Sequence, residues 1–63
     1  MSNYQTVFAV DVFEEREDFT RRLFTKFFNY DEEAKAEEYV DWYNGIFAPK
    51  RLPNSYAELP YKV

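Results

Sequence analysis

Two stretches in the first half of the chain have the composition of β-strands. Residues 4–13 are rich in Val, Phe and Thr, residues 19–28 mix Thr, Phe and Leu with Arg and Lys, and neither stretch contains Gly or Pro. β-Branched and aromatic residues favour an extended backbone. The short polar segment 14–18 between them predicts an antiparallel hairpin with a loop of about three to five residues. Without an Asn-Gly or Asp-Gly pair, the register stays open by one residue.

Neither strand alternates cleanly between apolar and polar positions, as a strand with one face in water would. Both faces carry large apolar side chains: Phe8, Val10 and Val12 against Val7, Ala9 and Phe13 on the first strand, and Phe24 and Phe28 against Phe19, Leu23 and Phe27 on the second. We therefore expect both faces of the hairpin to need cover.

The segment after the hairpin predicts a helix over about residues 30–44. Asn29 precedes Glu32 at capping-box spacing, and Asp31, Glu32 and Glu33 place carboxylates where the first turn favours them. An apolar stripe follows at helical spacing, formed by Ala36, Tyr39, Val40 and Tyr43. Gly45 stands just beyond and can close the helix in the left-handed conformation.

The C-terminal residues 48–63 predict an irregular tail. Pro49, Pro53 and Pro60 exclude a long helix or a central strand, and the spacing of Ser55 and Glu58 suggests one helical turn before Pro60. Its apolar residues predict that the tail packs on the core or on a partner. The expected fold is one α+β domain over residues 1–63, with a ββα core at 1–47 and an extended tail at 48–63.

The residue inventory excludes most site chemistries. The chain of 63 residues has no Cys and no His, so disulfides, common zinc and iron–sulfur sites and the usual nucleophilic triads are absent. The single glycine cannot build a phosphate-binding loop. Carboxylate pairs such as Glu33 and Glu37 exist, but so small a chain offers little room for a pocket. We expect no enzyme activity, no cofactor and no metal.

Charge and hydropathy constrain partner and location. The net charge is −4, which disfavours nucleic acid as a partner, although Arg22, Phe24, Lys26 and Phe28 interleave cations and rings on one strand face. No signal peptide is visible, and the apolar run 7–10 is too short to cross a bilayer. The expectation is a cytoplasmic protein, in the host cytoplasm if it is viral.

The uncovered hairpin face predicts association. A homodimer that extends or stacks the hairpins is one solution, cover by the tail is a second, and a foreign target is a third. Trp42 lies off the helical stripe, so with Phe47 and the tail it either widens the core or anchors an interface. The candidate surface joins the helix-end aromatics to the uncovered hairpin face, with acidic residues steering a basic partner. The candidate partner-binding residues are Tyr39, Trp42, Tyr43, Asp31, Glu38, Asp41, Phe24 and Phe28.

The sequence therefore predicts a small, non-catalytic module that binds another protein and regulates or inhibits it. Compact, acidic, aromatic-rich domains without catalytic groups are typical of the inhibitors that phages and mobile elements make, for example against a host defence system. One alternative is an acidic mimic of nucleic acid, in which the carboxylates of residues 31–41 replace phosphates and block a DNA- or RNA-binding enzyme. Another is a structural subunit of a larger assembly.

Overall fold

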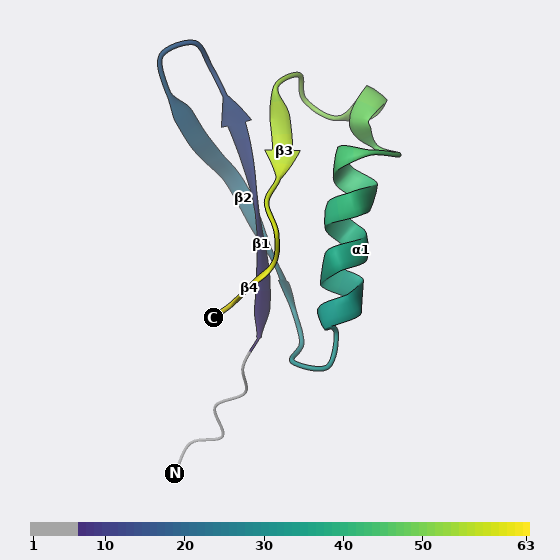
Figure 1. Ribbon diagram of the computed structural model, residues 1–63. Helices are drawn as coiled ribbons and strands as arrows, with labels where there is room; N and C mark the ends of the chain where they lie inside the picture. Colours follow the sequence, from purple (N-terminus) through teal and green to yellow (C-terminus); the bar gives the residue numbers. More distant parts are fainter. Residues whose placement is uncertain (1–6) are drawn as a thin grey trace.

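The computed structural model describes residues 7–63 and confirms an α+β fold (Figure 1). In chain order its elements are β1 (Phe8–Glu15), β2 (Thr20–Phe28), α1 (Glu33–Asn44), the 3₁₀ helix η1 (Ala48–Lys50), β3 (Ser55–Ala57) and β4 (Tyr61–Lys62). The first predicted strand was placed from residue 4, and its residues 4–6 lie outside the described part of the chain. None of the helices described is long and apolar enough to span a membrane.

The hairpin of β1 and β2 is antiparallel, with Phe8 opposite Phe28 at one end and Glu15 opposite Thr20 at the other. Residues 16–19 form the loop, closed by a hydrogen bond of 2.7 Å from the Arg16 N–H to the Phe19 carbonyl oxygen. The predicted loop length is therefore confirmed.

An irregularity in β2 changes the prediction for Leu23. The register shifts between Val12 and Phe13, which lie opposite Phe24 and Arg22, so Leu23 has no partner across the hairpin. Such a bulge interrupts the alternation of faces. Leu23 packs against the core, so its assignment to the same face as Phe27 was wrong.

The C-terminal tail contributes two strands, which the sequence did not predict. In β3, Ala57 lies opposite Val12 and Ser55 opposite Glu14, while in β4 Lys62 lies opposite Phe8. The helical turn expected at residues 55–58 is wrong, because the backbone of this segment pairs with the second edge of β1 instead. Both tail strands are antiparallel to β1, which makes β1 the centre of the sheet and leaves β2 at one edge.

Helix α1 begins three residues later than predicted, after a turn at residues 30–31. The prediction that Asn29 caps the helix is wrong, because the N-cap residue is Glu32, which makes no side-chain capping hydrogen bond. Instead, the Asn29 N–H donates to Glu32 Oε1 at 2.9 Å, and the Glu32 N–H donates to the Asn29 carbonyl oxygen at 2.9 Å. The first of these bonds lowers the pKa of Glu32 below its ordinary value of 4.5. Asn29 and Glu32 thus order the turn before the helix.

At the other end of α1, the prediction of a left-handed Gly45 is wrong, since its φ is −113°. The Gly45 N–H donates to the Asp41 carbonyl oxygen at 2.9 Å, and a Cβ at this position would lie 3.0 Å from that oxygen. Glycine therefore suits this position because it has no Cβ to crowd the Asp41 carbonyl oxygen. Among the residues that the structure describes, a positive φ occurs at Asn54, with φ 65°, just before β3.

The core lies between α1 and one face of the sheet. It consists of Phe8, Val10, Val12, Ala36, Val40, Tyr43 and Ala57. Phe24 and Phe28 lie opposite Val12 and Phe8, so they share this helix-covered face. The predicted apolar stripe of the helix is therefore the core stripe, and Phe24 and Phe28 belong to the covered face of the hairpin rather than to the uncovered one.

Candidate functional site

An open groove lies between α1 and β2, at the margin of the core. We call it the aromatic groove; its rings are those of Phe24, Tyr39, Trp42, Tyr43 and Phe47, and Phe28 continues the row along β2. Asn44 at the end of α1 bonds to Ala57 of β3, while β2 lies beyond β1 on the other side of the sheet (Figure 1). This arrangement leaves the helix-facing side of β2 partly uncovered, and Phe24 remains 43% exposed.

The rings of the groove contact one another in a continuous row. Trp42 stacks on Phe47 with the ring centroids 4.6 Å apart, and the centroid of Tyr39 lies 5.7 Å from that of Trp42. Across the groove, Phe28 lies 5.9 Å from Tyr39. Burial raises the pKa of the Tyr39 phenol. Trp42 is 39% exposed, so a large, rigid apolar ring faces water in a fixed position.

Three cations line this groove. The Lys26 ammonium lies 5.5 Å from the centroid of Phe28 and 5.6 Å from that of Tyr39, and the Arg51 guanidinium lies 6.0 Å from the centroid of Tyr43. Lys50 lines the same groove. Within residues 7–63, the salt bridges involve Arg16, Arg21, Arg22 and Lys35, and none reaches the three groove cations. No carboxylate lines the groove either, so its lining side chains carry a net positive charge in a protein of net charge −4.

The structure brings the five predicted aromatic residues together and leaves the three predicted carboxylates elsewhere. Asp31, Glu38 and Asp41 are exposed, and Asp41 lies with Asn44 and Ala57 in a shallow depression on the β3 side of the helix. The helix end therefore does not combine an aromatic cluster with an acidic rim.

Seven residues that line the groove were not predicted as partner-binding residues: Leu23, Thr25, Lys26, Phe47, Lys50, Arg51 and Leu52. The last three come from η1 and the following loop, which bring the chain beside β2. Phe47 was considered only as a possible extension of the core stripe. Its spacing of four residues from Tyr43 was a usable signal, but no local pattern places Lys50 or Arg51 beside Lys26.

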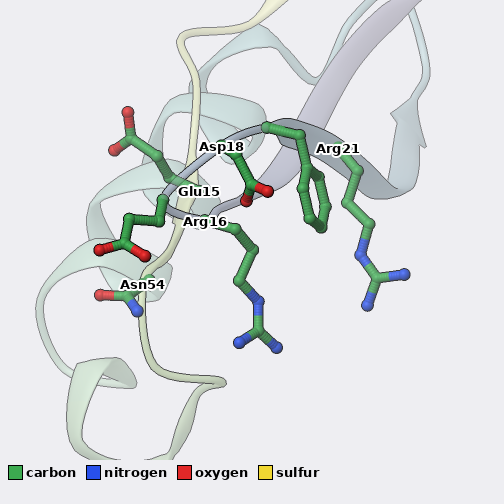
Figure 2. Close-up of a pocket in the computed structure, with 7 residues that line it drawn as sticks. Glu15, Arg16, Asp18, Arg21 and Asn54 are labelled. Atoms are coloured by element: carbon green, nitrogen blue, oxygen red, sulfur yellow. The ribbon is translucent and has the colours of Figure 1, made fainter.

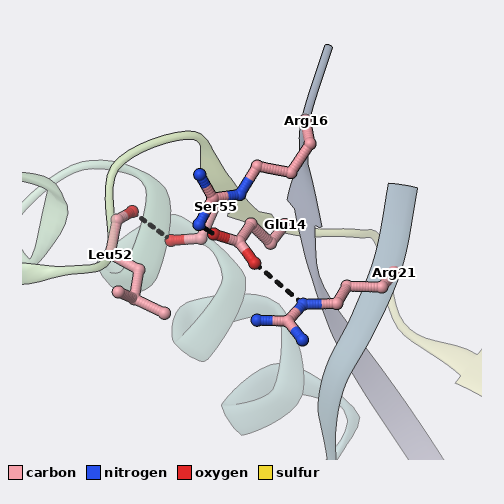
Figure 3. A network of polar contacts seen from close by, with 5 residues as sticks. All are labelled: Glu14, Arg16, Arg21, Leu52 and Ser55. Atoms are coloured by element: carbon pink, nitrogen blue, oxygen red, sulfur yellow. Dashed lines mark hydrogen bonds and ion pairs between the residues drawn. The ribbon is translucent and has the colours of Figure 1, made fainter. Parts of the chain in front are cut away.

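A buried carboxylate anchors the far end of the hairpin. Glu14 is 2% exposed, and its two oxygens accept from Arg16 Nη2 at 2.7 Å and Arg21 Nε at 2.9 Å (Figure 3). The Arg21 hydrogen bond is the main cause of a lowered pKa at Glu14. Beside it, the Ser55 hydroxyl donates to the Leu52 carbonyl oxygen at 2.6 Å, and the Tyr43 and Ser55 hydroxyl oxygens are 3.0 Å apart. All these groups are paired, so the cluster connects hairpin and tail rather than presenting a reactive group.

The hairpin loop adjoins a polar depression (Figure 2). Glu15, Asp18 and Asn54 line it together with Arg16 and Arg21, whose side chains extend to the same side of the loop in the figure. The two guanidinium groups are already bound to Glu14. The three carboxylates of the lining, those of Glu15, Glu17 and Asp18, therefore outnumber its cations, and the depression carries no free cation for an anionic ligand.

The second face of the sheet carries no helix within residues 7–63. Phe13 packs against Tyr56 with the centroids 6.0 Å apart, and Phe27 is 63% exposed. At its centre Asp11 accepts from the Thr25 hydroxyl and lies 3.9 Å from Arg22, and its hydrogen bond with Tyr61 raises the pKa of that phenol. These polar interactions of Asp11 divide the apolar surface of this face into smaller patches. The face therefore has less need of a covering element than the sequence suggested.

In the part of the chain that the structure describes, no group of three or more His, Cys, Asp or Glu residues could hold a metal ion. Searches against protein-family models, curated proteins and solved structures found no match for this chain. The geometry of the molecule is therefore the basis for assigning a function.

Proposed function

We propose that this chain is a non-catalytic module that binds another protein through the aromatic groove between α1 and β2. The observation that carries the proposal is the exposed ring of Trp42, held in place by its stack with Phe47 at a centroid distance of 4.6 Å. Because the Trp42 side chain is already held in one position, little of its conformational entropy is lost when a partner covers it.

The composition of the groove supports a protein partner. Trp, Tyr and Arg are the residues most enriched at binding hot spots, and the groove holds Trp42, Tyr39, Tyr43 and Arg51. A hot spot works when surrounding contacts exclude water, and the open walls formed by α1 and β2 allow a partner to do this. When a partner covers the exposed part of Trp42, each Å² of apolar surface removed from water contributes about 25 cal/mol of favourable free energy.

The role that fits such a module is regulation or inhibition of a larger protein in the cytoplasm, as phage and mobile-element inhibitors do. A homodimer is a separate proposal, tested by the mass in solution over a range of concentrations. The nucleic-acid mimic and the structural subunit remain alternatives. The first predicts binding that weakens steeply with salt, and the second predicts a stable complex without an inhibitory effect.

The test compares capture of host proteins by the wild-type chain and two variants. Trp42→Ala removes the exposed ring, and Leu59→Ala removes an apolar side chain that is 79% exposed and lies outside the groove. We expect a specific partner to be captured by wild type and Leu59→Ala but not by Trp42→Ala, and the purified pair to show the same order of affinity. Equal capture by all three folded proteins would refute the groove as the binding surface.

A further inference from the structure

We infer that the groove takes an extended, acidic segment of the partner, which adds as a strand to the free edge of β2. This inference rests on the proposed function and specifies the chemistry of the partner. It combines two features of residues 7–63 that meet at β2: groove cations that make no salt bridge, and a backbone edge that pairs with no strand.

The charges of the groove select an acidic occupant. All eight Lys and Arg residues of the chain lie within the described range; four take part in salt bridges, and three of the other four line the groove. Lys26 lies between Phe24 and Phe28 on the same face of β2, because it is opposite Val10 in the hairpin. A carboxylate beside Lys26 would therefore sit between two aromatic side chains, where water is partly excluded and its attraction is stronger than on an open surface.

The backbone of β2 selects an extended occupant. Residues 20–28 pair with β1 on one side only, so within residues 7–63 the outer N–H and C=O groups of β2 have no strand partner (Figure 1). An added strand would pair with these groups and direct alternate side chains to the helix side of the sheet. Those side chains would lie beside Phe24, Lys26 and Phe28 and reach toward Trp42. The segment that fits alternates apolar and acidic residues.

The same charges disfavour a second copy of the chain on this edge. Arg21, Arg22 and Lys26 give β2 three cations, and its nine residues include no carboxylate. An antiparallel pair of two β2 strands would bring two such sets together, and like charges on neighbouring strands destabilise a sheet. Charged side chains on an edge strand are a known protection against self-pairing. Toward an acidic strand, the cations become attractive.

Nucleic acid fits less well than an acidic peptide. Its phosphates would find the groove cations, and its bases could stack on Trp42 and Phe47. However, a nucleic acid cannot satisfy a row of backbone N–H and C=O groups along β2 as a peptide strand does. The net charge of −4 also repels an extended polyanion beyond the groove.

The test begins with the selection of random peptides on the immobilised 63-residue chain, each peptide having the length of β2, 9 residues. We expect the selected peptides to be acidic with apolar residues at alternate positions. Binding is then measured by the fluorescence of Trp42, the only tryptophan of the chain. Lys26→Glu should weaken binding roughly tenfold. Lys62→Glu, which makes the same charge change on β4 at the opposite edge, should leave it unchanged.

Two further measurements test the strand geometry. Bound peptide should slow amide hydrogen exchange at alternate residues of β2, and N-methylation of every second peptide amide should abolish binding in one phase of the alternation only. Loss of binding in both phases, or exchange protection confined to α1, would contradict strand addition. Circular dichroism of each variant checks that the fold is retained.

Other outcomes separate this inference from the proposed function. Selection of neutral or basic peptides, or none, would overturn the acidic strand while a Trp42-dependent partner still upheld the proposed function. If a single-stranded oligonucleotide competes for Trp42, and its binding weakens steeply with salt, the occupant of the groove is nucleic acid rather than an acidic strand. If light scattering shows a dimer and Trp42→Ala dissociates it, the occupant of the groove is a second copy of the chain.

Discussion

Asn44 connects the end of α1 to β3 through two hydrogen bonds, and their removal should destabilise the fold measurably. Its Nδ2 donates to the Ala57 carbonyl oxygen at 2.9 Å, and its Oδ1 accepts from the Ala57 N–H at 2.9 Å. The side chain thus binds both backbone groups of a residue that is 4% exposed. Asn44→Ala deletes both bonds, so the Ala57 N–H and carbonyl oxygen must hydrogen-bond to water instead.

The expected magnitude follows from these two bonds. Each neutral hydrogen bond contributes about 0.5–1.5 kcal/mol, so the pair contributes about 1–3 kcal/mol. Asn44 is exposed, so water replaces part of the loss, and alanine gains about 0.5 kcal/mol in helix propensity. We expect Asn44→Ala to lower the free energy of unfolding by about 1.5 kcal/mol. In a domain of this size that lowers Tm by roughly 6–12 °C.

Urea unfolding followed by Trp42 fluorescence measures this change, and amide exchange at Ala57 shows whether β3 is released. Glu38→Ala is the control, since it alters an exposed position of the same helix. Asn44→Asp adds a second comparison: it keeps the acceptor for the Ala57 N–H but places an oxygen opposite the Ala57 carbonyl, so it should be at least as unstable as Asn44→Ala. A loss below about 0.5 kcal/mol for Asn44→Ala would refute the assigned role of Asn44.

Three further predictions test the core, the hairpin end and the support of the groove. Val10→Ala, at a fully buried position, should cost about 2 kcal/mol in urea unfolding; an unchanged midpoint would contradict the core assignment. Because the pKa of Glu14 is lowered from 4.5, the folded state binds fewer protons than the unfolded chain, so stability present above pH 4.5 should fall as pH drops through the folded pKa. Glu14→Gln should flatten that dependence of the urea midpoint, and an identical pH profile would argue against it. Tyr43→Phe, which deletes the hydroxyl 3.0 Å from Ser55 Oγ, should cost about 1 kcal/mol in thermal unfolding while the ring keeps its place; no change in Tm would indicate that this bond contributes nothing.

Local chemistry determined the two strands, the helix and the excluded site types. Val, Phe and Thr at 7–13 and 19–28 favour extended backbone wherever the segment lies, and the spacing of Ala36, Val40 and Tyr43 puts them on one helix face in any helix. Strand propensity and helical spacing depend only on residues close together in the sequence, so the strands and the helix could be predicted without the tertiary structure. The absence of Cys and His is a fact of inventory and needed no structure.

Tertiary contacts decided the tail and the groove. Ser55, Tyr56 and Ala57 form too short a segment for their propensities to specify a strand, and they become one because β1 offers unpaired backbone groups along its second edge. The bulge at Leu23 likewise depends on the pairing of β1 with β2. Alternation within a single strand could not reveal it, which is why Leu23 was assigned to the wrong face.

Four of the five rings that line the candidate site were predicted as partner-binding residues, whereas Phe47 and the net positive charge of the lining were not. Tyr39, Trp42 and Tyr43 are neighbours along one helix, whereas Lys26 in β2 and Arg51 are separated along the chain by α1 and η1. They line one groove because the hairpin and the turn after α1 bring both ends of that segment to the same side of the helix. Nearby acidic residues suggested a basic partner, and only the folded chain separates those carboxylates from the rings and puts cations beside them.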